Sequence, residues 1–172
     1  MDIKLGDWKI EYADDLQKLA NNKKIWQNLT DGFPHPYTKN DAIEFINTAL
    51  SADKTKSLFK AIIVDGKFCG SIGAFKKDGL FSKSAEIGYW LSEPHWGKGL
   101  ITAAISEICK LAFEVFDIVR IYATPYEHNI GSRRALEKNG FILEGIMKKG
   151  AYKAGHLLNY CMYAKILEEN KI

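Results

Sequence analysis

Ala85-Glu-Ile-Gly-Tyr-Trp-Leu-Ser-Glu-Pro-His-Trp-Gly-Lys-Gly-Leu-Ile-Thr102 is the stretch of the sequence on which the architecture depends. Its first part, Ala85–Leu91, alternates between two sets of side chains and predicts a strand. From Ile101 to Val115 the apolar residues recur at helical spacing, and Ile118–Thr124 then predicts a second strand. A strand, a helix and a parallel strand in this order form a crossover unit.

The regions on either side of this unit predict further strands and helices. Upstream, two strand-like runs are joined by Asp65-Gly66, a dipeptide that favours a tight hairpin. With Ala85–Leu91 they form an antiparallel meander, and a mixed sheet with helices on it follows, an α+β fold. The other expected elements are helical spacing within 12–30, a helix beginning near Thr38 and Asp41, strands Ser57–Val64 and Lys67–Phe75, a helix Asn129–Asn139, and strands Phe141–Lys149 and Leu157–Lys165.

The composition indicates one ordinary globular domain over residues 1–172. The chain is 47% hydrophobic and carries 24 basic against 21 acidic residues, a net charge of +3. Such a balance argues against a nucleic-acid-binding protein and against an acidic disordered tail. No linker, repeat or low-complexity tract interrupts the chain.

The cysteines and the N-terminus indicate a cytoplasmic protein. Cys69, Cys109 and Cys161 are far apart and odd in number, which argues against a disulfide framework and a metal site and favours buried thiols in a reducing compartment. The N-terminus has no apolar signal segment, and no apolar run approaches the ~20 residues of a membrane span. We therefore expect a soluble protein with no metal and no membrane partner.

The loop Trp96–Thr102 has the features of an anion-binding turn. A helix start leaves backbone N–H groups unpaired, and its dipole favours negative charge. Gly97 and Gly99 allow a tight turn and a close approach of the backbone, while Lys98 adds a charge and Thr102 a hydroxyl. The loop matches neither a Walker A motif nor a dinucleotide-binding motif. A plain strand-to-helix turn remains the alternative.

Two other polar positions stand out beside this loop. Glu86 lies on the strand face shared with Gly88 and Trp90, where a charge is costly to bury unless it is used or paired. A solvent-facing position is the alternative. Asn129 and Ser132 open a helix directly after a strand, either as part of a site or simply as a helix N-cap and a first-turn residue.

These residues together resemble the GNAT superfamily of acyl-coenzyme A N-acyltransferases. The resemblance rests on Ala85–Leu91, on Trp96-Gly-Lys-Gly99 with its helix, and on Asn129-x-x-Ser132 followed by Glu137-Lys-Asn-Gly-Phe141. The early Phe33-Pro-His-Pro-Tyr-Thr38 extends it, and the nearest branch is that of the ribosomal-protein-alanine N-acetyltransferases. It implies a mostly antiparallel mixed sheet of about seven strands with one splayed parallel pair.

The resemblance also implies acetyl-CoA as co-substrate. The 96–102 loop would bind the pyrophosphate, and the end of the preceding strand would pair with the pantetheine arm, which Asn129 would hold from the opposite side. Arg134 would reach a phosphate or remain a solvated helix residue. The implied cofactor-binding residues are Trp90, Leu91, Ser92, Trp96, Gly97, Lys98, Gly99, Leu100, Ile101, Thr102, Asn129, Ser132 and Arg134.

The catalytic residues implied by the resemblance are Glu86, Ser132 and Asn129. Glu86 would take the proton of the amine, directly or through water. Leu136 stands where many members carry the tyrosine that protonates the leaving thiolate, so Ser132 is the candidate for that role.

The acceptor site would contain Phe33, His35 and Tyr37 together with the 150–160 turn. The alternative for these three residues is loop packing between the prolines.

Two classes of function remain open at this point. One is an N-acetyltransferase for a primary amine, either a protein N-terminus of the ribosomal-protein type or a small amine such as a polyamine or aminoglycoside. The other is a non-catalytic acyl-CoA-binding regulatory module. A wide acceptor cleft would argue for a peptide and a closed acidic pocket for a polyamine or aminoglycoside. The resemblance allows a monomer or a homodimer.

Overall fold

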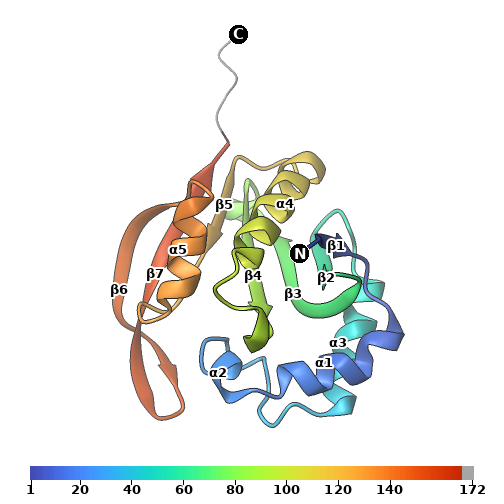
Figure 1. Cartoon of the computed structure of the whole chain (residues 1–172). Helices are drawn as coiled ribbons and strands as arrows, with labels where there is room; N and C mark the ends of the chain where they lie inside the picture. The colour runs from blue at the N-terminus through green and yellow to red at the C-terminus, as the bar shows by residue number, and fades with distance from the viewer. Residues whose placement is uncertain (168–172) are drawn as a thin grey trace.

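The computed structural model describes residues 1–167, and the last residues of the domain expected over 1–172 lie outside this range (Figure 1). The chain order is β1 Ile3–Gly6, η1 Ile10–Tyr12, α1 Ala13–Ala20, α2 Lys23–Trp26, α3 Lys39–Ser51, β2 Ser57–Val64, β3 Lys67–Lys76, η2 Gly79–Phe81, β4 Ser84–Leu91, η3 Glu93–His95, α4 Leu100–Val115, β5 Arg120–Ala123, α5 Ile130–Lys138, β6 Ile142–Lys153 and β7 His156–Ile166.

The strands form one seven-stranded sheet in the order β1-β2-β3-β4-β5-β7-β6. Every neighbouring pair is antiparallel except β4 and β5, which are parallel and are joined through α4. The expected mixed α+β fold is therefore confirmed. Strand β1 was not anticipated, because its four residues are too few to show an alternating pattern.

The parallel pair separates after a short ladder. Glu86 pairs with Tyr122 in the last rung, whereas β4 continues to Leu91. Beyond β5 the chain follows β7, since Tyr126 forms a bridge with Tyr160. Among the described residues the edge of β4 that faces β5 therefore has no strand partner after Glu86, and a gap opens between the two strands.

Apolar side chains cover both faces of the sheet. One core joins the sheet to α4 and α5 and includes Ile87, Leu91, Ile105 and Leu136. The other joins the opposite face to α1 and α3 and includes Trp90, which confirms that Trp90 points away from the face of Ile87 and Leu91. Tyr89 packs against the first core.

Two local signals are found as expected. Thr38 caps α3 with a reciprocal capping box, because its hydroxyl accepts from the Asp41 N–H while the Asp41 carboxylate accepts from the Thr38 N–H. Asp65 and Gly66 both have positive φ and join β2 to β3, as a tight hairpin turn requires. Cys69, Cys109 and Cys161 are free and buried.

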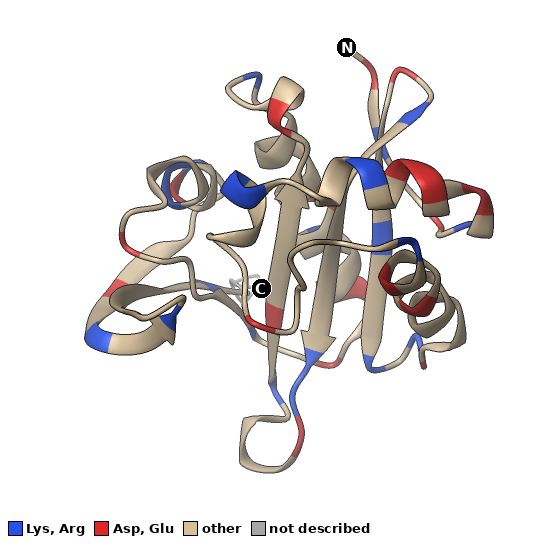
Figure 2. Cartoon of the chain, turned by 90° about the horizontal axis from the view of Figure 1, so that it is seen from below, with Lys and Arg blue, Asp and Glu red and all other residues tan. Residues whose placement is uncertain are grey.

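Charged residues are spread around the sheet in both signs (Figure 2). No helix within residues 1–167 is long and apolar enough to cross a membrane.

Candidate active site

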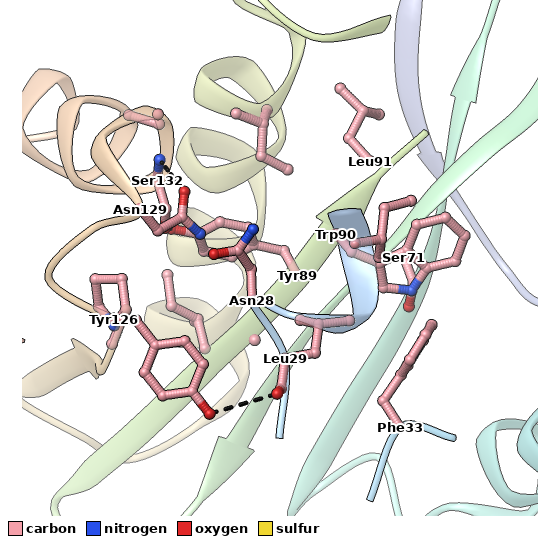
Figure 3. A pocket seen from close by; sticks show the side chains of 18 of the residues that line it. Asn28, Leu29, Phe33, Ser71, Tyr89, Trp90, Leu91, Tyr126, Asn129 and Ser132 are labelled. Atoms are coloured by element: carbon pink, nitrogen blue, oxygen red, sulfur yellow. Dashed lines mark hydrogen bonds between the residues drawn. The ribbon is translucent and has the colours of Figure 1, made fainter. Parts of the chain in front are cut away.

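A cavity of about 1130 Å³ lies where β4 and β5 separate. Its wall runs from the N-terminus of α4, past the free edge of β4 and the start of α5, to a group of aromatic side chains near α3. Figure 3 shows Tyr89 turned toward Asn129 and Ser132, while Trp90 points the other way, toward Phe33. Tyr89 and Trp90, which are neighbours on β4, therefore line different parts of the same cavity.

The first turn of α4 presents backbone N–H groups that are not capped by a side chain within the described residues. Gly99 occupies the N-cap position in the left-handed conformation at φ 76°, and no side chain of residues 1–167 caps the helix. Gly97 is also left-handed, at φ 72°. These two left-handed residues turn the chain so that the first N–H groups of α4 face the cavity. The residues that line the cavity here are Gly99, Leu100, Ile101 and Thr102. An anion fits this end of the cavity.

The rest of the loop is held by hydrogen bonds of its own. The indole N–H of Trp96 donates to the Leu91 carbonyl at 2.6 Å, and the Lys98 ammonium donates to the Pro94 carbonyl at 2.8 Å. Ser92 is buried and its hydroxyl lies 2.8 Å from Nδ1 of His95. Lys98 and Ser92 are thus engaged in bracing the loop, and neither lines the cavity.

Glu86 sits at the last rung of the β4–β5 ladder and is bound on both oxygens. Its Oε2 accepts from the Lys77 ammonium at 2.6 Å and from the Tyr122 hydroxyl at 3.3 Å. Its Oε1 accepts only a long hydrogen bond, 3.4 Å, from Thr124 within the described chain. Glu86 and Thr124 line the cavity whereas Lys77 and Tyr122 do not, so Oε1 is the oxygen on the cavity side.

The Lys77 ammonium is firmly charged in this pair. Burial acts to lower its pKa, but the hydrogen bond and negative charge of Glu86 outweigh it, and the pKa of Lys77 is raised. The Lys77 and Glu86 side chains are 34% and 33% exposed, so the pair is open to solvent in part. Lys77 also lies 5.6 Å from the centre of the Tyr122 ring.

The start of α5 brings two of the expected residues together. Asn129 is the N-cap, and its Oδ1 accepts from the Ser132 N–H at 3.2 Å. The Ser132 hydroxyl lies 2.7 Å from the Tyr89 hydroxyl of β4. Leu136 is fully buried in the core, so the phenol beside Ser132 comes from β4 and not from α5.

The far end of the cavity is aromatic and carries little acidic charge. Phe33 and Tyr37 line it with Phe45, Phe59 and Phe75. Burial raises the pKa of Tyr37 to about 12. Apart from histidines, the charged residues that line the whole cavity are Lys24, Glu86, Arg134 and Lys138.

Residues 22–31 run across the cavity between its two sides. At one end, the Asn22 side chain donates to Glu93 at 2.9 Å and Lys24 pairs with the same carboxylate. At the other end, the Tyr126 hydroxyl donates to the Leu29 carbonyl at 3.4 Å (Figure 3). The cavity is thus bridged over part of its length and open elsewhere.

The structure brings most of the expected site residues to one cavity. Those that line it are Phe33, Tyr37, Glu86, Trp90, Leu91, Trp96, Gly97, Gly99, Leu100, Ile101, Thr102, Asn129, Ser132 and Arg134. His35, Ser92 and Lys98 do not line it, and His35 instead packs its ring 5.5 Å from that of Trp26.

Sequence reasoning did not single out Tyr89, Lys77 or Thr124 as site residues. The strand pattern predicts Tyr89 as a core residue, and its hydrogen-bond partner Ser132 is 43 residues away in sequence. The pairing of Lys77 with Glu86 could have been predicted from the sequence, because Lys77 lies nine positions before Glu86 and faces it across a hairpin. Within residues 1–167 no three His, Cys, Asp or Glu side chains gather as metal ligands would.

Comparisons with known proteins match this geometry. Residues 2–142 match the family model described as the acetyltransferase (GNAT) domain. The putative ribosomal N-acetyltransferase YdaF of Bacillus subtilis (strain 168) is 33% identical over 108 residues, 63% of this chain and 58% of the relative. The ribosomal-protein-serine acetyltransferase of Escherichia coli (strain K12) is 30% identical over 95 residues, 55% of this chain and 53% of the relative. The matches thus span little more than half the length of these two relatives.

Solved structures resemble the chain over nearly its whole length. The microcin C7 self immunity acetyltransferase MccE, in complex with acetyl-CoA and AMP, has a TM-score of 0.83 at 26% identity and covers 96% of this chain and 93% of its own. RimL, a ribosomal L7/L12 alpha-N-protein acetyltransferase in complex with coenzyme A, has a TM-score of 0.85 at 23% identity, covers 96% and 94%, and shares the fold. With a family model matched over most of its length, the chain belongs to the GNAT acetyltransferase family.

Proposed function

We propose that this chain is an N-acetyltransferase that moves the acetyl group of acetyl-CoA to a primary amine, with residues 1–172 acting as one domain. The observation that carries the proposal is the single cavity between β4 and β5. It joins an anion-binding helix start at one end to an aromatic, solvent-open region at the other, with a carboxylate between them. A two-substrate transfer needs both ends to meet at one reacting group.

The residues at the α4 end fit acetyl-CoA, which supplies an acetyl thioester when bound. The open N–H groups of Leu100, Ile101 and Thr102 would hold the pyrophosphate. The edge of β4 beyond Glu86, which has no strand partner within residues 1–167, would hold the pantetheine arm as an added strand does. Arg134 lines the cavity from α5 and is exposed, so it can reach a phosphate.

Glu86 would remove the proton that keeps an ammonium from attacking. The proton goes to Oε1, which faces the cavity, because Oε2 is taken by Lys77 and Tyr122. Thr124 lies beside the same oxygen and can relay a proton through water. Ser132, fixed on the first turn of α5 by Asn129, would donate to the departing sulfur.

Among amine acceptors we favour a peptide N-terminus over a polycation. A polyamine or aminoglycoside needs several carboxylates, yet among the acidic residues of the described range 1–167 only Glu86 lines the cavity, and it is already paired with Lys77. The aromatic end is instead suited to an apolar side chain next to the amine. The ribosomal-protein substrates named for two relatives support a protein acceptor, which would place the reaction in the cytoplasm.

The test is release of free thiol from acetyl-CoA with three sets of acceptors: peptides with free N-termini, polyamines and aminoglycosides. We expect turnover with peptides, more with an apolar residue at the second position than with an acidic one. Glu86→Gln should lower kcat at least tenfold while acetyl-CoA affinity changes less than twofold. Binding of acetyl-CoA without turnover on any acceptor would contradict an enzyme and support the acyl-CoA-binding module.

A further inference from the structure

Tyr89 is a cavity residue that the proposed reaction has not used. Its hydroxyl lies 2.7 Å from the Ser132 hydroxyl, and its ring packs against the core that joins the sheet to α4. We infer that Tyr89 is a positioning residue, which holds the Ser132 hydroxyl with its hydrogen directed into the cavity as a donor to the thioester sulfur. The inference rests on the proposed function and deepens the role of Ser132.

The direction of the hydrogen bond follows from the two hydroxyls. A phenol is the stronger donor and the weaker acceptor of the pair, because its oxygen shares electron density with the ring. A half-buried phenolic O–H that leaves its hydrogen unpaired loses stability, and Ser132 is its one hydrogen-bond partner within residues 1–167. Tyr89 therefore donates to Ser132 Oγ.

Ser132 is fixed from two directions and keeps its own hydrogen free. Asn129 holds its backbone N–H at 3.2 Å, and Tyr89 occupies one lone pair of its Oγ. Because Oγ accepts from Tyr89, the Ser132 O–H must point away from the phenol. Ser132 lines the cavity (Figure 3), and the cavity is the side left open for that hydrogen.

This arrangement stabilises a thiolate without transferring a proton to it. An alkyl alcohol is a far weaker acid than a thiol, and the ordinary pKa of the cysteine thiol is about 8.5. Burial raises the pKa of Tyr89, so the phenol stays protonated as well. During transfer the C–S bond breaks and its electron pair stays on sulfur, the N–C bond forms, and the amine proton goes to Glu86. The sulfur leaves as a thiolate held by the Ser132 O–H and takes its proton later from water.

A direct test compares the binding of coenzyme A with that of desulfo-coenzyme A, in which a hydrogen replaces the SH group so that the arm ends in CH₃. Calorimetric titrations at pH 6.5 and pH 9 need no turnover. At pH 9 the wild-type chain should bind coenzyme A about tenfold more tightly than the desulfo analogue, the effect expected of one charge-assisted hydrogen bond. At pH 6.5, where the thiol is protonated, the preference should shrink to about twofold.

Tyr89→Phe removes only the hydroxyl and keeps the ring in the core. It should lower the preference at pH 9 to about twofold, and Ser132→Ala should abolish it. Tyr126→Phe is the matched control, because Tyr126 lines the same cavity but its hydroxyl donates to the Leu29 carbonyl and not to Ser132. That variant should retain the wild-type preference.

Kinetics supply a second readout. Tyr89→Phe should lower kcat about tenfold with the KM for acetyl-CoA unchanged, and should have no further effect in a Ser132→Ala background. The inference is overturned if Tyr89→Phe keeps the full thiol preference, or if the two substitutions lower kcat independently.

The outcomes also separate the inference from the proposed function. If neither coenzyme A nor its desulfo analogue binds the wild-type chain, the proposed function itself fails. If both bind and Ser132→Ala removes the preference while Tyr89→Phe does not, only the role of Tyr89 fails.

Discussion

Glu86 combines two properties that seldom occur in one side chain. It is anchored by an ammonium at 2.6 Å, as a structural ion pair is, and it faces the cavity with its other oxygen, as a base must. The Lys77 ammonium fixes Oε2, which leaves Oε1 directed toward the cavity. The ion pair therefore positions the carboxylate for the reaction, and this effect can be measured.

Lys77→Met should lower kcat with a peptide acceptor about tenfold, because Oε2 of Glu86 loses its hydrogen bond from the Lys77 ammonium and Oε1 is no longer held toward the cavity. The measurement is kcat at saturating acetyl-CoA and peptide. Lys83→Met is the control, since Lys83 pairs with Asp117 away from the cavity. An unchanged kcat in Lys77→Met would show that Lys77 does not position Glu86.

The buried thiol of Cys109 should make the free energy of unfolding depend on pH in the alkaline range. It is 2% exposed in α4, and burial raises its pKa from 9.0 to about 12. Because the folded-state value is the higher one, the stabilisation is complete below pH 9.0 and is lost as pH rises toward 12. Between pH 8.5 and 10.5 this thiol should lower the free energy of unfolding by roughly 1–2 kcal/mol.

Urea denaturation across that pH range checks this expectation. Cys109→Ala should be less stable at pH 7 because it leaves a small cavity, but its stability should fall less steeply between pH 8.5 and 10.5. An equal slope in the two proteins would mean that other groups account for the alkaline loss.

The turn before α4 shows how one local element creates a binding site. Gly97 and Gly99 both adopt positive φ, and a Cβ built on either one meets no atom of the described part of the chain within 4 Å. Substitution there is therefore opposed by backbone conformation and not by crowding. The sequence predicts this turn well, because two glycines before an apolar helical period have few other uses.

Gly99→Val should weaken acetyl-CoA binding about tenfold, since a β-branched residue resists the left-handed conformation and the first N–H groups of α4 would turn away. The free energy of unfolding should fall by about 1–2 kcal/mol. Gly79→Val is the matched control, because Gly79 is also left-handed, at φ 59°, and equally uncrowded, but does not line the cavity.

The control variant should lose similar stability and bind acetyl-CoA normally. Affinity measured by calorimetry and stability measured by urea denaturation distinguish the two effects. Equal affinities for Gly99→Val and the wild-type chain would show that the α4 turn does not hold the ligand.

Across the whole molecule, the parts that could be predicted from the sequence are those set by local periodicity. The strand, helix and strand periodicities of β4, α4 and β5, the α3 capping box and the residues of the 96–102 loop all depend on neighbours in the chain. Contacts between distant segments could not be read in this way. The Tyr89–Ser132 pair joins residues 43 apart, and Lys153 reaches Asp31 across 122 residues.

The difference between local patterns and contacts of distant segments also explains why the acceptor site was predicted only in part. The motif Phe33–Tyr37 was expected to line it throughout, but His35 turns to Trp26 while Phe33 and Tyr37 line the cavity. Side-chain direction in an irregular loop depends on what the loop packs against. The open, weakly acidic character of the cavity is likewise a property of the assembled fold.

Transfer of acetyl to an amine in this cavity, with Glu86 as base and a peptide as the favoured acceptor, can be measured by mass spectrometry. One peptide that carries both a free α-amine and a lysine is incubated with acetyl-CoA and either the wild-type chain or Glu86→Gln. We predict a single acetyl group on the α-amine with the wild-type chain and at least tenfold less with Glu86→Gln. An unmodified peptide alongside acetylated spermidine would contradict the peptide acceptor, and equal acetylation by the two proteins would contradict Glu86 as the base.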